Sequence, residues 1–305
     1  MRFTVAQWSP EYGTPTELDD TTGRVEVGVE VPPGEWHGLV PDVDPATDVL
    51  FIDGVRRVDA NLWIEQAGGR PVLGLAATYA AGAVRSNGAA EIVAAKVERG
   101  LFTSAPASDI VTTCGTYAVK ATSGQTPEEL WLGIQQRMGE LEGAVAADQG
   151  GATLVVADGP LSHHRHAEGA IHRVVGYVKR EHVEYLPSEL WDVKYGLGVG
   201  RRTPLFLTTT SWSRYSWYVR LATGAGPAEG LVRCEVSGDM DIAAAVRLAD
   251  RVTATLPRFA SAPHKDPRAP ENLYPIAGLE RELRRRLGDR DVLYRALRRA
   301  AVQAA

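Results

Sequence analysis

The stretch "LVVADGPL" (154–161) repeats a pattern that first occurs at "VLFIDGVR" (49–56). In both places an apolar run typical of a buried strand ends on an aspartate that is followed by glycine. A single Asp-Gly pair is usually just the turn after a strand. If the two strands are neighbours in one sheet, however, Asp53 and Asp158 project from adjacent strand ends. Two carboxylates so placed repel each other unless a cation neutralises them, which favours a Mg²⁺ or Mn²⁺ site.

The segments around these strands predict an α/β fold with a mixed sheet flanked by helices. Residues 48–66 are interpreted as two strands joined by a polar bend, and residues 89–103 fit either a strand or a helix. Helices are predicted after Thr126 and over 241–256, followed by a proline-punctuated loop at 261–275 and a basic helix or helix pair. The remaining predicted strands are 23–32, 70–86, 109–122, 170–180, 203–211, 214–223 and 230–238.

The helix after Thr126 has the clearest start signal in the chain. Thr126 is a good N-cap, Pro127 suits the first helical position, and Glu129 completes a capping box. Its apolar residues form one stripe at three- and four-residue spacing, which faces a core. The stripe consists of Trp131, Ile134, Met138, Leu141 and Val145.

Two glutamates of this helix, Glu140 and Glu142, are candidates for a third carboxylate beside the aspartates. On a helical wheel, Glu142 lies about 70° from the centre of the apolar stripe and Glu140 about 130° away. Geometry therefore favours Glu142, at the edge of the buried face. The alternative is that both are solvated, as most glutamates of amphipathic helices are.

Composition limits the class of protein. The 305 residues are 44% hydrophobic and 23% charged, and the two cysteines, Cys114 and Cys234, form no C-x-x-C pair. No apolar run is long enough for a membrane span and no secretory signal is evident, so a cytoplasmic protein is expected. The formal net charge is -5. That average hides a basic C-terminal region, in which residues 281–300 hold eight arginines against Glu282, Asp289 and Asp291.

The sequence resembles the NurA family of nucleases over roughly residues 48–287. The resemblance rests on the ordered set Asp53-Gly54, "QRMGELE", "VVADGPL", "VVGYVKR", "SWYVRL" and "LYPIAGLE". It implies an RNase H-like core with a metal-dependent DNA nuclease site, a homodimeric ring, and docking onto a hexameric HerA-type ATPase that pumps DNA. Residues 1–47 are then a β-rich N-terminal extension, 48–287 the nuclease domain, and 288–305 a basic C-terminal helix.

The resemblance also implies roles for single residues. The family's two aspartates fall on Asp53 and Asp158, and its helix glutamate, judged by spacing, falls nearer Glu140 than Glu142. Its lysine falls on Lys179 and its late tyrosine on Tyr274.

A late histidine that the family pattern places about two turns further on is absent here. Glu282 occupies its neighbourhood and is one candidate metal ligand. Glu280 is another, and His264 could reach in from the loop at 261–275. A weakened activity is the remaining interpretation.

Other histidines and several cations have weaker interpretations. His163, His164 and His166 could hold Zn²⁺ with His172, but adjacent positions point in different directions and no well-spaced second pair is present. We expect them to line the site beyond Asp158 or to lie on the surface. In a nuclease, some basic residues line the DNA path and neutralise phosphates. The candidates are Arg56, Arg165, Lys179, Arg201 and Arg202.

Together these patterns predict a Mn²⁺- or Mg²⁺-dependent DNA nuclease that works with a translocase in DNA end processing or defence against phage. Two alternatives remain at this stage. One is an RNase H-like enzyme that cleaves RNA in a hybrid with DNA. The other is a ring-shaped subunit with a decayed site that docks the ATPase.

Overall fold

One mixed sheet forms the centre of the computed structural model, which describes residues 1–5, 23–66, 69–161, 174–180, 183–210, 212–224 and 226–304. The sheet order is β2-β10-β11-β12-β9-β8-β3-β4-β5-β7-β6, with β1 beside β3. The strands are β1 Phe3–Val5, β2 Arg24–Glu26, β3 Val49–Ile64, β4 Val72–Asn87, β5 Ala89–Thr103, β6 Ile110–Thr112, β7 Gly115–Ala121, β8 Leu154–Asp158, β9 Val174–Val178, β10 Phe206–Thr209, β11 Ser213–Arg220 and β12 Leu231–Ser237.

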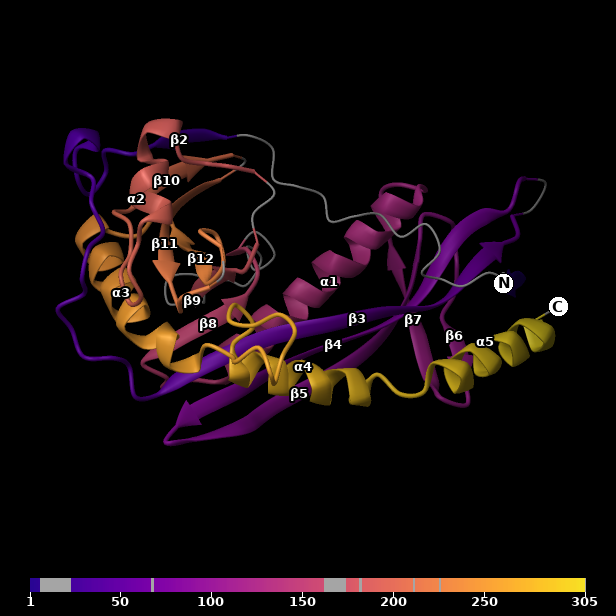
Figure 1. Ribbon diagram of the computed structural model, residues 1–305. Coiled ribbons are helices and arrows are strands. Elements are labelled where there is room, and N and C mark those ends of the chain that lie inside the picture. The colour runs from indigo at the N-terminus through magenta and orange to yellow at the C-terminus, as the bar shows by residue number, and fades with distance from the viewer. Residues whose placement is uncertain are drawn as a thin grey trace.

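Helices lie on both faces of this sheet (Figure 1). The α-helices are α1 Pro127–Asp148, α2 Trp191–Tyr195, α3 Ile242–Thr255, α4 Tyr274–Arg286 and α5 Arg290–Ala304. The prediction of a mixed α/β fold with a helical C-terminus is therefore confirmed, and the basic C-terminal segment is a helix pair. Among the described helices, none combines the length and the apolar character that crossing a membrane requires.

The long strands β3, β4 and β5 form an antiparallel meander, and β8 then pairs with β3 in parallel. Strand β9 continues this parallel arrangement beside β8, and β12 pairs with β9 antiparallel. Helix α1 occupies the connection between β7 and β8. The meander thus brings the two Asp-Gly segments, about a hundred residues apart in sequence, onto neighbouring strands.

Strand β3 differs from the prediction of two strands with a polar bend. It runs unbroken from Val49 to Ile64, with a bulge between Val58 and Ala60. The polar stretch stays in the sheet because its charges find partners. Asp59, fully buried, accepts hydrogen bonds from Arg57 Nε and Tyr117 Oη, each at 2.9 Å. Asp53-Gly54 is therefore inside a strand and does not end one.

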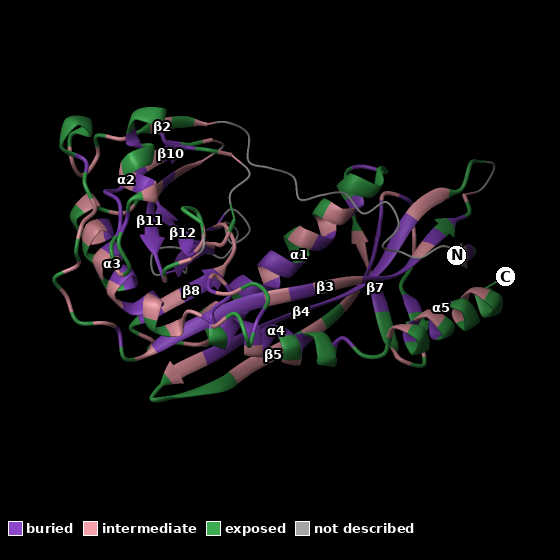
Figure 2. Cartoon of the chain, viewed as in Figure 1, coloured by how far each residue is buried: buried purple, intermediate pink, exposed green. Residues whose placement is uncertain are grey.

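The alternation of β3 side chains divides the core into two layers. Leu50 and Ile52 pack in the cluster that contains the α1 residues Ile134 and Met138. Phe51, between them in sequence, packs in the cluster to which α4 contributes. Figure 2 shows these central strands as the most buried part of the sheet. Helices α1 and α4 thus cover opposite faces of β3. In this part of the strand, even-numbered side chains point toward α1 and odd-numbered side chains point toward α4.

The start of α1 agrees with its prediction in detail. The Thr126 side chain accepts from the Glu129 backbone N–H, the Glu129 side chain accepts from Thr126 N, and Pro127 is the first helical residue. The buried stripe is slightly rotated, because Leu130 is fully buried whereas Trp131 is only partly buried. This rotation carries Glu142 into the protein.

The secondary structure of two other segments is decided by tertiary contacts. Residues 89–103 form a strand, since they pair along nearly the whole of β4. The predicted strand at 23–32 is confined to Arg24–Glu26, because the Trp36 indole donates to the carbonyls of Val27 and Val31 at 2.9 and 3.2 Å. Strands β1 and β2, from the N-terminal 47 residues, pair with β3 and β10 and so join the same sheet.

Candidate functional site

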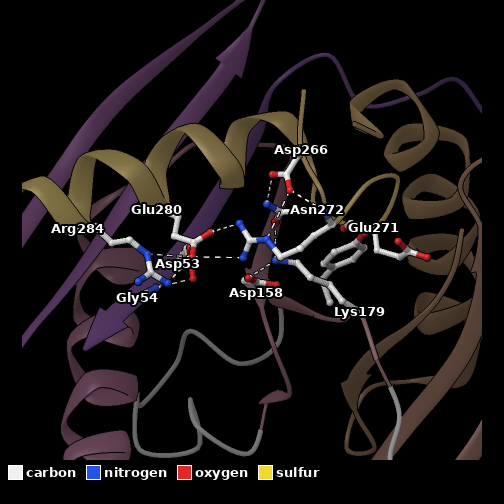
Figure 3. A network of polar contacts seen from close by, with 11 residues as sticks. Asp53, Gly54, Asp158, Lys179, Asp266, Glu271, Asn272, Glu280 and Arg284 are labelled. Carbon is white, nitrogen blue, oxygen red and sulfur yellow. Dashed lines mark hydrogen bonds and ion pairs between the residues drawn. The ribbon is translucent and has the colours of Figure 1, made fainter. Parts of the chain in front are cut away.

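Asp53 and Asp158 occupy equivalent positions on the neighbouring parallel strands β3 and β8. The register aligns Ile52 with Ala157, so the next residue along each strand is one of the two aspartates. Neighbouring strands lie about 4.8 Å apart. The aspartate side chains lie side by side between residues from α4 and residues near the end of β9 (Figure 3). The predicted juxtaposition of Asp53 and Asp158 is thus present.

The two carboxyl groups are held where ionisation is unfavourable. Burial raises the pKa of Asp53 well above its usual range, and the charge of Asp158 raises it further. Burial also raises the pKa of Asp158, against the lowering effect of the Lys179 ammonium. Lys179 Nζ donates to Asp158 Oδ2 at 2.5 Å, whereas Asp53 Oδ1 accepts from the Gly54 N–H at 2.8 Å. A single ammonium does not offset two buried carboxylates, so the pair favours a proton or an added cation.

Glu142 reaches the same cluster from the opposite side of the sheet. It is 3% exposed, and a side chain added at Gly54 would collide with its carboxyl group. Burial, followed by the charge of Asp158, raises the pKa of Glu142 to about 8, and the Arg56 guanidinium opposes this shift. The helical wheel therefore predicted correctly which of the two glutamates is buried near the aspartates.

Glu140 does not belong to the cluster. Its side chain is 40% exposed and accepts from Arg137 Nη1 at 2.7 Å, one turn back on the surface of α1. This placement corrects the spacing-based assignment of Glu140 as a metal ligand. The physical reason is the rotation of α1, which points residue 142 inward and residue 140 outward.

Glu280, from α4, supplies a fourth carboxylate near the aspartates and is 9% exposed. Arg268 Nη2 and Arg284 Nη2 donate to it at 2.6 and 2.8 Å. Burial raises the pKa of Glu280, but these hydrogen bonds outweigh burial and leave the pKa below its ordinary value. Figure 3 shows Glu280 and Arg284 on the Asp53 side of the cluster.

Glu282 points away from this cluster. It accepts from Arg285 and Arg286 on the outer surface of α4, and these hydrogen bonds lower its pKa to about 2. The expectation that Glu282 replaces the missing histidine as a metal ligand is therefore corrected. Glu280, one of the alternatives, is the α4 glutamate that faces the aspartates.

Tyr274 and His264 lie at the edge of the site. Tyr274 begins α4, is 39% exposed, and its hydroxyl accepts from the Ala262 N–H at 3.1 Å, so it braces the preceding loop. His264 is exposed in that loop. The histidines of the possible zinc site, His163, His164, His166 and His172, lie outside the described residues, as does Arg165.

The basic candidates separate into distinct environments. Arg56 lies over the Trp131 ring at 5.5 Å on the Glu142 side, and Arg201 is exposed. Arg202 is not on a DNA path, because its side chain is 2% exposed and it pairs with Glu30 and Asp250 at 2.8 and 2.7 Å. This corrects the interpretation of Arg202 as a phosphate contact, and the cause is a pair of acids distant in sequence.

Sequence reasoning proposed His264 from the loop between α3 and α4 but missed the three residues of this loop that contact the site. These residues, Asp266, Arg268 and Asn272, all bond to members of the cluster or to each other. The prolines in this segment indicated an irregular loop and nothing about its direction. A mixture of acid, arginine and asparagine between prolines was the one available signal.

The carboxylates of the site are suitable ligands for a hard divalent cation, but they do not form a complete coordination group. Carboxylate oxygens are the ligands that Mg²⁺ and Mn²⁺ prefer, and the like charges of Asp53, Asp158 and Glu142 require a counter-charge. Across the described part of the chain, however, no three acidic, histidine or cysteine side chains stand close enough together to hold a metal ion. Asp53 and Asp158, at equivalent positions on adjacent strands, are the described pair best placed to hold one.

Comparison with known proteins does not assign a family. No protein-family model matches the chain, and no curated sequence matches it significantly.

Proposed function

We propose that this protein is a Mn²⁺- or Mg²⁺-dependent deoxyribonuclease with an RNase H-like core, similar to the NurA nucleases. The observation that carries the proposal is the placement of Asp53 and Asp158 at equivalent positions on adjacent parallel strands. The order β5-β4-β3-β8-β9, with an antiparallel meander, a helix and then two parallel strands, is the one expected of an RNase H-like sheet. It supports the proposal independently of the carboxylates.

The residues of the site suit phosphodiester cleavage. Asp53 and Asp158 would hold the cation, which when bound supplies an activated water and charge neutralisation for attack at phosphorus. The Lys179 ammonium has three N–H donors, and its bonds to Asp158 and Asn272 leave one for a phosphate oxygen. Glu142, with a pKa of about 8, can hold or release a proton near neutral pH.

A nuclease assay tests this proposal. Linear duplex DNA, single-stranded DNA and an RNA/DNA hybrid are incubated with the protein and Mn²⁺, Mg²⁺ or EDTA. We expect cation-dependent DNA cleavage that falls by about a hundredfold or more in Asp53→Asn and Asp158→Asn. Asp148→Asn is the matched control, because Asp148 is 58% exposed and pairs only with Lys96 among the described contacts.

The variants also report on folding, which separates loss of chemistry from loss of structure. Removing one of two mutually repelling buried charges should raise the melting temperature of Asp53→Asn and Asp158→Asn. DNA cleavage that survives both substitutions would overturn the site, and preferred cleavage of the RNA strand of the hybrid would favour the RNase H-like alternative.

A second candidate is a ring-shaped subunit that docks an ATPase without cleaving DNA. The absence of a preassembled three-ligand group among the described residues favours it. No cleavage by the wild-type protein, even with the ATPase present, would support this role.

The homodimer and the HerA-type hexameric ATPase partner rest on the family resemblance. Sedimentation at the mass of two chains, and co-sedimentation with the ATPase, test them.

A further inference from the structure

A chain of hydrogen bonds joins the Lys179 ammonium to the loop before α4. Fully buried Asn272 accepts from Lys179 Nζ through its Oδ1 at 2.8 Å. The Nδ2 of the same amide donates to Asp266 Oδ2 at 2.7 Å. The other oxygen of Asp266 accepts from the Arg268 N–H at 2.8 Å. Asn272 therefore lies between a carboxylate and an ammonium.

This arrangement permits one orientation of the amide. A side-chain amide can rotate to exchange its oxygen and its nitrogen. An ionised carboxylate only accepts and an ammonium only donates, so Asp266 must face Nδ2 and Lys179 must face Oδ1. Burial raises the pKa of Asp266, but hydrogen bonds from Arg268 and Asn272 outweigh it and keep the group ionised at neutral pH.

The backbone around Asn272 is anchored to the same part of the sheet. The Asn272 N–H donates to the Arg268 carbonyl at 2.9 Å, which closes the loop on itself. The carbonyl of Glu271 accepts from the Tyr177 hydroxyl at 2.6 Å, and the Glu271 carboxylate accepts from the Gly230 N–H at 2.6 Å. Because Tyr177 lies on β9 and Lys179 directly follows the end of that strand, the amide and the ammonium are both held at the end of β9.

We propose that Asn272, oriented by Asp266, is a positioning residue that fixes the Lys179 ammonium over Asp158. Asn272 and Asp158 engage two N–H groups of Lys179 and leave the third for a phosphate oxygen of the substrate. The substrate contact rests on the proposed nuclease function. The positioning of the ammonium by Asn272 does not depend on that function. The positioning role and the substrate contact can therefore be disproved separately.

The reactivity of the amine tests the fixing directly. The intact protein is briefly acetylated with an activated acetate ester, and modification of each lysine is followed by peptide mass spectrometry. In Asn272→Ala we expect Lys179 to react about tenfold faster, the fold-change that corresponds to losing one hydrogen bond to a charged group. Lys194, which is buried and pairs with Glu184, is the internal control for general loosening of the fold.

A second pair of variants keeps the test valid if Asn272→Ala folds poorly. Asp266→Ala removes the acceptor that orients the amide, so Lys179 should again react faster. Asp266→Asn retains an oxygen acceptor for Asn272 Nδ2 and should keep the reaction rate within about twofold of the wild type. Unchanged Lys179 reactivity in both Asn272→Ala and Asp266→Ala would overturn the proposal.

Kinetics then test the substrate contact. Asn272→Ala should lower kcat about tenfold with little change in KM for DNA, because the residue orients a group that acts in the transition state. Asn87→Ala, at the exposed end of β4, is the matched control. Faster acetylation with an unchanged kcat would refute the catalytic part of the proposal. If the wild-type protein does not cleave DNA, the proposed function fails while acetylation still decides the positioning role.

Discussion

At the scale of single residues, the site is an accumulation of carboxyl groups with too little positive charge among them. Asp53, Asp158 and Glu142 all have raised pKa values, and burial is the largest cause in each. The Lys179 ammonium donates to Asp158, and the Arg56 guanidinium opposes the raised pKa of Glu142 without cancelling it. A fold tolerates such a group at a cost in stability, which is typical of a functional site.

The two helix glutamates give a matched pair of variants. We expect Glu142→Gln to lower cation-dependent DNA cleavage by about a hundredfold, since its carboxyl group is buried and interacts electrostatically with Asp158. Glu140→Gln should stay within about twofold of the wild type, because it removes only an exposed ion pair. Initial rates of both variants at saturating Mn²⁺ check this. Equal, mild losses at both positions would contradict a role for either glutamate in the cluster.

Glu142 also predicts how stability depends on pH. Its pKa is about 8 in the folded protein, against 4.5 for a glutamate side chain exposed to water. Between these values the folded state holds a proton that the unfolded chain releases, so stability falls as the pH rises through this window. The slope reaches about 1.4 kcal/mol per pH unit for each such proton. Urea unfolding in EDTA from about pH 5 to about pH 8 measures it.

Glu142→Gln is the control for this pH dependence. The variant should gain stability over the wild type most at the alkaline end of the range and least at the acid end. A residual slope should remain, because Asp53 and Asp158 have pKa values shifted in the same direction. A wild-type stability that rises between pH 5 and pH 8 would show that these carboxyl groups do not govern the titration.

The sequence identified Asp53 and Asp158 because each follows a recognisable apolar run, whereas Lys179 was identified as a site residue through the family resemblance. It left the two helix glutamates unresolved, since a spacing argument and a helical wheel disagreed. It failed for Arg202, whose burial depends on Glu30, a residue 172 positions away. Partners so distant in sequence leave no local pattern.

At the scale of elements, the site depends on the close approach of α1 to β3. At Gly54 an added Cβ would collide with the Glu142 carboxyl group and lie 2.9 Å from Met138 Cγ. Gly54→Ala should therefore displace α1 and destabilise the fold by about 1–3 kcal/mol. It should also reduce cleavage, because Glu142 moves with the helix. Urea unfolding and initial rates check the two effects.

Gly278→Ala provides the comparison for this substitution. Gly278 lies within α4, and an added Cβ there would meet no atom within 4 Å. Alanine is the better helix former, so this variant should gain about 0.5–1 kcal/mol. A Gly54→Ala protein as stable and as active as the wild type would contradict the tight contact between α1 and β3.

Most elements could be predicted because their signals are local. The capping box at Thr126 and the apolar run of β8 are examples, and both agree with the structure. The Asp-Gly pair of β3 could not be judged locally, since the same dipeptide ends one strand and lies within another. The loop before α4 carries Asp266 and Asn272 to the site, and no periodic pattern records the direction of such a loop.

At the scale of the whole molecule, the sheet brings together segments that are distant in sequence. The helix α1 leads the chain from the meander to β8, so that residues 53 and 158 become neighbours. The loop before α4 and α4 itself then close over these strands from the other face. The sequence predicted the mixed sheet, but only the strand order makes the two aspartates one site.

The central claim is that Asp53 and Asp158 form one divalent-cation site. Calorimetric titration of Mn²⁺ into the metal-free protein tests it most directly, with Asp53→Asn, Asp158→Asn and the exposed control Asp148→Asn titrated alongside. We predict binding with release of protons in the wild type and in Asp148→Asn, because the raised pKa values leave protons for the cation to displace. Affinity should fall by about tenfold or more in each of the other two variants. Equal Mn²⁺ affinity in all four proteins would contradict the site.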